Sequence, residues 1–298
     1  MSQGYDPVIL IGMHRSGTSL LCRLLEGLGL FVGRDLEHNH ESLFFQHINR
    51  WSLRQASARW DNPGMVDALL ASDKLCDLVT EAIDGRLHGL GARRYLGWRR
   101  FLAHRGIDAR LAFAWGWKDP RNTYTLPLWL RLFPAARVIT IERHGVDVAA
   151  SLRARAERQS QAAIARYRRF KPLERLRPKR GGFAASVRCL TLAGGLDLWE
   201  EYVVRARAHA ASLGPGRCLS LHYEDLLRDP VPTLAKAAEF AGLEASGDRL
   251  RALTAGIDAN RAFAYRADEE LATFAARHRD RLAAFDYAEA KASKSPAA

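Results

Sequence analysis

Residues 8–25, with the sequence VILIGMHRSGTSLLCRLL, decide the fold of this chain. The stretch opens with an apolar run of β-type residues, Val8 to Ile11, and continues into a polar loop from Gly12 to Ser19. Leucines at positions 20, 21, 24, 25 and 28 then recur at helical spacing. This order predicts a strand, a tight loop and a helix.

The loop has the glycine spacing of the phosphate-binding pattern G-x-x-x-x-G-K-[ST], with Gly12 and Gly17 in place. The glycines let successive backbone N–H groups turn toward an anion, and the start of the helix adds its positive dipole end. Thr18 stands where an ATPase or GTPase has lysine, and the cation is Arg15 instead. A simple turn is the alternative, but strand, glycines, hydroxyls, cation and helix all occur in register. We therefore predict a site for a phosphate-like group.

Composition is typical of a globular protein. The chain has 298 residues, of which 48% are hydrophobic and 26% charged, enough for one large domain or two small ones. No apolar stretch reaches the roughly 18–20 residues of a membrane span, and the N-terminus lacks the basic region of a secretory signal. The four cysteines are far apart without metal-binding spacing, and Cys22 and Cys218 are predicted core thiols. We expect a cytoplasmic protein without a transmembrane segment.

The net charge of +12 is unevenly distributed. Eleven Lys or Arg and two Glu occur between Arg153 and Arg180, and the rest of the chain is nearly balanced. Pro172 and Pro178 interrupt this segment, which predicts either a solvated insertion or mobile loop, or a surface that contacts an anionic acceptor. Few aromatic residues are interleaved with the charges, so we expect no specific binding of nucleic acid.

Further strands are predicted over residues 111–117, 137–141 and 218–223, with helical patterns between them. Charged residues follow the first two, and α/β sheets bind ligands at the carboxyl ends of their strands. Arg143 ends the second of these strands, and seven residues separate it from Ser151 in the next helix. A right-handed crossover could direct this guanidinium and this hydroxyl to one anion.

Between residues 65 and 110 the helical pattern contains no catalytic signal. The pairs Arg93-Arg94 and Arg99-Arg100, together with Trp98, are interpreted as surface and packing residues. An acceptor cleft lined by these residues is the alternative.

Three segments occur in an order that resembles a known family: residues 12–19, then Arg143 with Ser151, then Tyr223-Glu224-Asp225-Leu226 with Pro230. The chain resembles the sulfotransferases that use 3′-phosphoadenosine 5′-phosphosulfate (PAPS). The likeness is closest to their bacterial branch and to the branch related to tyrosylprotein and carbohydrate enzymes. Residues 117–121, Trp-Lys-Asp-Pro-Arg, resemble a common feature of the bacterial members. The resemblance covers roughly residues 7–30, 112–152 and 217–243.

The resemblance implies a three-layer α/β/α fold with a mainly parallel central sheet, similar to P-loop NTPases. We expect a single domain over residues 1–287, with helical insertions at about 43–110 and 153–213, and a disordered tail over 288–298. The sequence predicts no oligomeric state.

The resemblance also implies transfer of a sulfuryl group from PAPS to a hydroxyl or amine, with release of 3′-phosphoadenosine 5′-phosphate (PAP) and no metal. Arg15 and Lys118 are predicted to stabilise developing charge. By position after the first helix, Glu41 is the predicted general base and His47 the second candidate. The residues predicted to bind the cofactor are His14, Arg15, Ser16, Gly17, Thr18, Ser19, Arg143, Ser151 and Tyr223.

Two other functions stay open. A nucleoside or small-molecule kinase could use the same scaffold, although Thr18 and the Arg143 and Ser151 pair argue against it. A non-enzymatic protein could grip an anionic polymer with residues 153–180. Carbohydrate, lipid or phenolic metabolite, and peptide tyrosine are all possible acceptors, and the basic charge favours an acidic or polymeric one.

Overall fold

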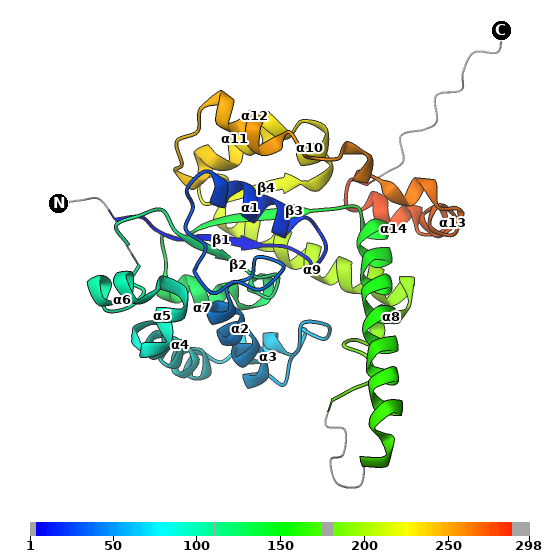
Figure 1. Cartoon of the computed structure of the whole chain (residues 1–298), viewed down its shortest axis with the longest axis horizontal. Helices are drawn as coiled ribbons and strands as arrows, with labels where there is room; N and C mark the ends of the chain where they lie inside the picture. Colours follow the sequence, from blue (N-terminus) through cyan, green and yellow to red (C-terminus); the bar gives the residue numbers. More distant parts are fainter. Residues whose placement is uncertain (1–3, 110, 174–180, 288–298) are drawn as a thin grey trace. The chain divides into compact units, whose positions relative to one another are not determined.

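A four-stranded parallel sheet organises the chain, as Figure 1 shows for a computed structural model that describes residues 4–109, 111–173 and 181–287. Its strands lie in the order β2-β1-β3-β4. They are β1 (Val8–Ile11), β2 (Gly116–Lys118), β3 (Arg137–Glu142) and β4 (Cys218–His222). The parallel sheet confirms the predicted α/β class. The tail predicted over 288–298 lies outside the described residues.

Two compact units divide the chain, and the first, Met1–Glu142 with Glu200–Ala259, contains the whole sheet. One group of helices packs together above the sheet in Figure 1: α1 (Thr18–Gly27), α11 (Pro230–Ala241) and α12 (Gly247–Thr254). A second group lies below it: α2 (Leu43–Gln55), α4 (Asp73–His88) and α7 (Asn122–Leu132). The unit also has α3 (Val66–Leu70), η1 (Leu90–Ala92), α5 (Arg93–Leu96), α6 (Trp98–His104) and α10 (Tyr223–Arg228).

The hydrophobic core of this unit is built around aromatic rings. Trp117 of β2 stacks on Phe45 of α2 with ring centroids 4.1 Å apart, and the edge of Trp129 in α7 approaches Trp117 at 4.9 Å. Ile9 and Ile11 belong to the same core cluster, as expected for alternate residues on one face of a strand. Large rings bury much apolar area per residue, so three of them fix α2 and α7 against the sheet.

The strand predicted over residues 111–117 is shorter than expected. Regular pairing is confined to β2, while Leu111 forms a single antiparallel bridge to Tyr5 and Trp115 a single parallel bridge to Phe31. The apolar run therefore changes partner along its length. Its hydrophobicity reflects core burial rather than one continuous strand.

The second unit comprises Arg143–Trp199 and Asn260–Ala298. Its longest element is α8 (Gly145–Phe170), joined by η2 (Lys171–Leu173), η3 (Arg188–Leu190), η5 (Ala264–Ala267), α13 (Glu269–Arg277) and α14 (Arg279–Ala283). Helix α9 (Leu192–Leu213) contributes its first turns here and its residues from Glu200 onward to the first unit. The turn η4 (Ala259–Arg261) contains the other unit boundary.

The basic segment that begins at Arg153 is helical as far as Phe170, where α8 ends. The alternative of a mobile loop is therefore wrong for this part of the segment. The first turns of α8 bury apolar side chains, among them Val148 and Leu152. The later turns are mostly Ala, Arg, Gln and Glu, which are strong helix formers, so the helix continues with little burial. Residues 174–180 of the segment lie outside the described residues.

Asn49 links the two lower helices to the segment after β2. Its amide nitrogen donates to Asp119 Oδ2 at 2.9 Å and to Asn122 Oδ1 at 2.7 Å. Its oxygen accepts from Thr125 Oγ1 at 2.7 Å and from Trp129 Nε1 at 2.9 Å. These four hydrogen bonds of the fully buried amide tie α2 to α7 and to Asp119.

Replacing Asn49 by Ala is expected to lower the free energy of unfolding by about 3 kcal/mol or more, since several buried groups lose a partner together. Ser52→Ala on the same helix is the matched control, because the Ser52 hydroxyl donates only to Ile48 O of its own helix. We expect that control to cost less than about 1.5 kcal/mol in urea unfolding. Equal losses for the two variants would contradict a linking role for Asn49.

Candidate functional site

The loop between β1 and α1 has a backbone that requires its glycines. Gly12 has φ +132° and Gly17 φ +93°, and Arg15 between them also has a positive φ of 72°. A Cβ at Gly12 would lie 2.7 Å from Ile141 O, and one at Gly17 would lie 2.2 Å from the ring of Tyr223. Tyr223, a predicted cofactor-binding residue, thus lies directly against the loop.

The residues of this loop fit an anion. Thr18 is the first residue of α1, so the loop leads into a helix N-terminus, whose first N–H groups have no acceptor within the helix itself. Ser16 Oγ is buried and has no hydrogen-bond partner within the described residues. Arg15 is exposed, whereas His14 and Thr18 are buried. A buried hydroxyl, backbone donors and an adjacent guanidinium together suit a phosphate or sulfate group.

Lys118, the last residue of β2, lies beside the start of α1. Its Nζ donates to Ser19 Oγ at 3.2 Å, to Asn39 O at 2.6 Å and to Glu41 Oε1 at 3.2 Å. The side chain is 2% exposed, and these three acceptors match its three protons. The structure therefore places a buried positive charge directly behind the first turn of α1.

Glu41 is the counterion of two cations. Besides Lys118, Arg121 Nη1 lies 3.4 Å from Glu41 Oε2, and Gln46 donates to the same oxygen at 2.7 Å. Burial alone would raise the pKa of Glu41, but Lys118, His14, Arg121 and the Gln46 hydrogen bond together lower the pKa to about 2. The carboxylate is accordingly ionised at neutral pH and is a weak proton acceptor in this state.

Arg121 is held by a second carboxylate. Asp119 Oδ1 accepts from the Arg121 backbone N at 2.9 Å and from Nη1 at 2.8 Å, while Asn49 donates to the other oxygen. The pairing fixes the turn between β2 and α7. Arg121 and Asn49 were not predicted as site residues, although a polar Asn on the apolar face of an amphipathic helix is a signal that could have identified Asn49.

His47 does not join Glu41. It is exposed on α2 and lines a hollow with residues of α4, including Gly85 and Arg86. Within the described part of the chain, its side chain forms no hydrogen bond or ion pair. The two predicted base candidates therefore occupy different surroundings.

Arg143 and Ser151 belong to the second unit. Arg143 Nη2 lies 3.4 Å from Asp147 Oδ2 and 3.4 Å from Arg261 O, and the side chain is largely buried. Asp147 Oδ1 also accepts from the Tyr265 backbone N at 2.8 Å, so one carboxylate holds both the arginine and the segment around Tyr265. Asp147 was not predicted as a site residue; it lies in the first turn of α8, four residues after Arg143, which precedes the helix.

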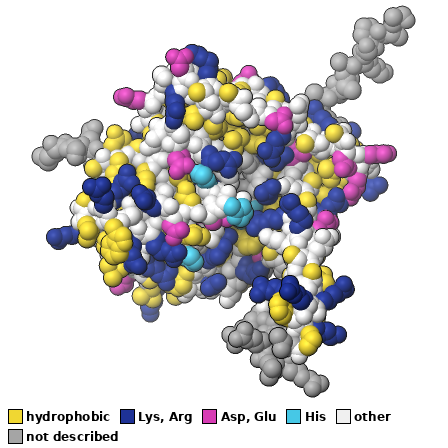
Figure 2. Space-filling model, in the orientation of Figure 1, with side chains coloured by type: hydrophobic (Ala, Val, Ile, Leu, Met, Phe, Trp, Pro, Cys, Tyr) yellow, Lys and Arg dark blue, Asp and Glu magenta, His cyan; other side chains and the backbone are white. Residues whose placement is uncertain are grey.

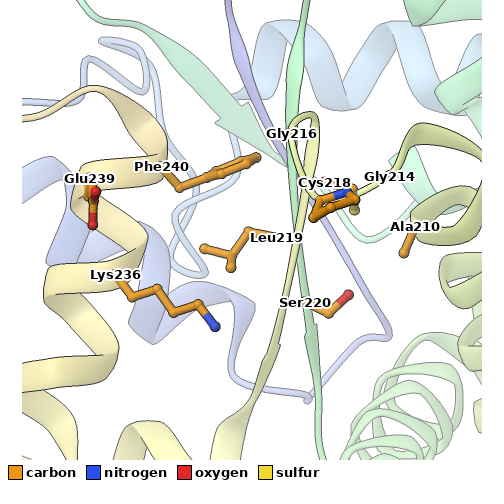
Figure 3. Close-up of a pocket in the computed structure, with 10 residues that line it drawn as sticks. Ala210, Gly214, Gly216, Cys218, Leu219, Ser220, Lys236, Glu239 and Phe240 are labelled. Carbon is orange, nitrogen blue, oxygen red and sulfur yellow. The ribbon is translucent and has the colours of Figure 1, made fainter.

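A separate pocket lies at the amino end of β4, as Figure 3 shows. Lys236 and Phe240 extend from α11 toward the strand. Its other lining residues come mainly from the turn at residues 214–216 and the first half of β4. Because the strands are parallel and the glycine loop follows the carboxyl end of β1, this pocket is not part of the loop site.

Within the described residues, no helix is both long and apolar enough to cross a membrane.

The chain is similar to proteins of one enzyme family. The sequence model of the Sulfotransferase family matches residues 7–247, and no curated protein matches the chain. The sulfotransferase domain of the Synechococcus PCC 7002 olefin synthase is 20% identical over 87% of this chain and 83% of that domain, with a TM-score of 0.44. A Mycobacterium tuberculosis H37Rv sulfotransferase is 16% identical over 86% and 72%, with a TM-score of 0.47. A mouse sulfotransferase solved with PAP is 15% identical over 87% and 65%, with a TM-score of 0.42.

The low pKa of Glu41 predicts a pH-dependent contribution to stability. A carboxylate with a folded-state pKa of about 2 and an ordinary value of 4.5 stabilises the fold above pH 4.5 and loses this contribution as pH falls toward 2. Glu41→Gln is expected to cost about 3 kcal/mol at pH 7, since it leaves buried cations unpaired. The difference from the wild type should shrink between pH 4.5 and 2 in urea unfolding.

Glu81→Gln provides the control, because Glu81 is an exposed carboxylate on α4. Its unfolding free energy should follow that of the wild type at every pH. A Glu41→Gln variant that also follows the wild type would show that the two ion pairs contribute nothing.

Proposed function

Since this chain belongs to the sulfotransferase family, we propose that it transfers a sulfuryl group from PAPS to a hydroxyl or amine of an acceptor and releases PAP. The observation that carries this proposal is the glycine loop at the start of α1 with the buried Lys118 behind it. PAPS supplies the activated sulfuryl group. The finer resemblance to bacterial, tyrosylprotein and carbohydrate enzymes stays a prediction.

We assign the 5′ side of the donor to the glycine loop. The backbone N–H groups of residues 17–19 and the Ser16 hydroxyl are the donors proposed for the phosphosulfate oxygens, and the exposed Arg15 is the cation. In the free protein Lys118 acts through its charge, because its three protons are bound there to Ser19, Asn39 and Glu41. A fixed positive charge next to the first turn of α1 favours the anionic leaving group.

Arg143 and Ser151 are proposed to hold the 3′-phosphate of the donor, as their spacing in the sequence suggests. The ion pair with Asp147 supports this assignment, because it holds the Arg143 guanidinium in one orientation. A 3′-phosphate site would distinguish PAPS from ATP, which has no phosphate at that position.

Glu41 is the proposed base that takes the acceptor proton, with His47 second. Its present contacts with Lys118 and Arg121 hold its pKa low, so the role requires that these cations shift toward the bound donor and release the carboxylate. His47 is exposed and lacks such a restraint.

Discrimination between PAP and adenosine 5′-phosphate tests the 3′-phosphate assignment. The wild type should bind PAP more tightly than adenosine 5′-phosphate, and Arg143→Ala or Ser151→Ala should reduce this preference by about 10-fold, the value of a charged hydrogen bond. Binding is measured by calorimetry, which needs no knowledge of the acceptor.

Arg158→Ala is the matched control, because Arg158 is exposed further along α8 and donates only to Ala154 O. The control should keep the preference for PAP. Loss of affinity for both nucleotides by equal factors in the Arg143 and Ser151 variants would refute a contact with the 3′-phosphate.

The base assignment predicts different losses for two variants. With any acceptor that the enzyme sulfates, Glu41→Gln should lower the rate of transfer by about 10²-fold or more, the usual contribution of a general base. The initial rate is followed with radiolabelled PAPS under saturating donor. A larger loss in His47→Ala than in Glu41→Gln would move the role to the histidine.

A further inference from the structure

Three large apolar side chains are exposed on the turns from η1 to α6. Leu90 is 65% exposed, Trp98 59% and Leu102 69%. Scattered apolar residues are normal on a protein surface, but contiguous ones indicate a contact site. The arrangement of these three therefore decides whether they have a function.

The three side chains form one patch. Trp98 and Leu102 lie one turn apart on α6, the spacing that places two residues on the same helix face. Arg93 joins them to Leu90, because its guanidinium lies 5.0 Å from the centre of the Trp98 ring and its Nη1 donates to Leu90 O at 3.0 Å. Figure 2 shows hydrophobic side chains bordered by Lys and Arg over α5 and α6.

The patch is strongly basic. From Arg86 to Asp108 the sequence contains six arginines and one acidic residue. That residue, Asp108, is hydrogen bonded to His88 at 3.0 Å, and the acidic Asp35 is paired with Arg94. Arg99 and Arg105 are exposed and form no ion pair with an acidic side chain within the described residues. The patch therefore combines exposed apolar side chains with guanidinium groups that have no acidic partner in the described part of the chain. It is complementary to a partner with a negatively charged surface layer and an apolar layer below it.

We propose that the patch of Leu90, Trp98 and Leu102, with its surrounding arginines, docks this enzyme on an anionic lipid bilayer. An amphipathic Trp is suited to the headgroup region, and the two leucines reach the acyl boundary. The arginines meet the negative headgroups. The charge argues for this occupant over a neutral protein surface, because an ordinary protein interface would leave the guanidinium groups without counterions.

Vesicle sedimentation tests the proposal. The intact protein is mixed with vesicles of phosphatidylcholine alone, or of phosphatidylcholine and phosphatidylglycerol in equal parts, at low and high salt. The wild type should sediment with the anionic vesicles at low salt, weakly at high salt, and not with the neutral vesicles. The double variants Trp98→Ser/Leu102→Ser and Arg99→Glu/Arg105→Glu should each lower the binding by about tenfold or more.

Matched controls come from other elements of the same unit. Val204→Ser removes an apolar side chain of similar exposure on α9, and Arg228→Glu/Arg251→Glu reverses two exposed arginines on α10 and α12. Both controls should bind vesicles like the wild type, and circular dichroism should show that all variants are folded.

Three outcomes would overturn the proposal. The wild type could fail to bind anionic vesicles, or the controls could lose binding as much as the patch variants. Alternatively, gel filtration could show a dimer that Trp98→Ser/Leu102→Ser converts to a monomer, which would make the patch a subunit interface.

Discussion

The burial of the Lys118 ammonium is the constraint on which the candidate site depends. A buried cation without partners costs several kcal/mol, and the chain offsets this cost with three acceptors. Ser19 comes from α1, while Asn39 and Glu41 come from the segment between α1 and α2. Satisfying one amine therefore fixes α1 and this segment to the end of β2, and with them the loop that precedes α1.

Other buried charges beside Lys118 also need partners. Glu41 also pairs with Arg121, Arg121 pairs with Asp119, and Asp119 accepts from Asn49 of α2. Each member would be costly to bury alone, so the network favours one arrangement of the segments that carry it. Its effect on the loop is electrostatic, because it holds the side chain of Lys118 beside the N-terminus of α1.

The spacing of apolar residues predicted helices and strands correctly where a segment buries one face, or both faces, along its whole length. The strands at residues 8–11 and 137–142 and the helix after Gly17 are confirmed, because their apolar residues follow strand or helix spacing. The strand predicted over residues 111–117 was too long, because this apolar run pairs with several different neighbours instead of one strand. The helix through Phe170 falls, from Arg153 onward, within a predicted helical insertion, but its later turns show no apolar period, because they are stabilised by propensity rather than by an apolar face.

The candidate site could be predicted only in part. The glycine loop is contiguous in the sequence, so the spacing of Gly12 and Gly17 was enough to predict it. Glu41 and Lys118, by contrast, are 77 residues apart, and no local periodicity connects them. The resemblance to a family suggested both residues, but their ion pair, and the low pKa that it imposes on Glu41, follow only from the tertiary structure.

Calorimetric titration with PAP, ADP and ATP, each with and without Mg²⁺, decides whether the loop and its buried lysine serve a phosphosulfate donor or a nucleoside triphosphate. We expect PAP to bind more tightly than either other nucleotide, with an affinity that Mg²⁺ does not change. Tight Mg²⁺-dependent binding of ATP, with no binding of PAP, would refute the proposed donor and favour a kinase.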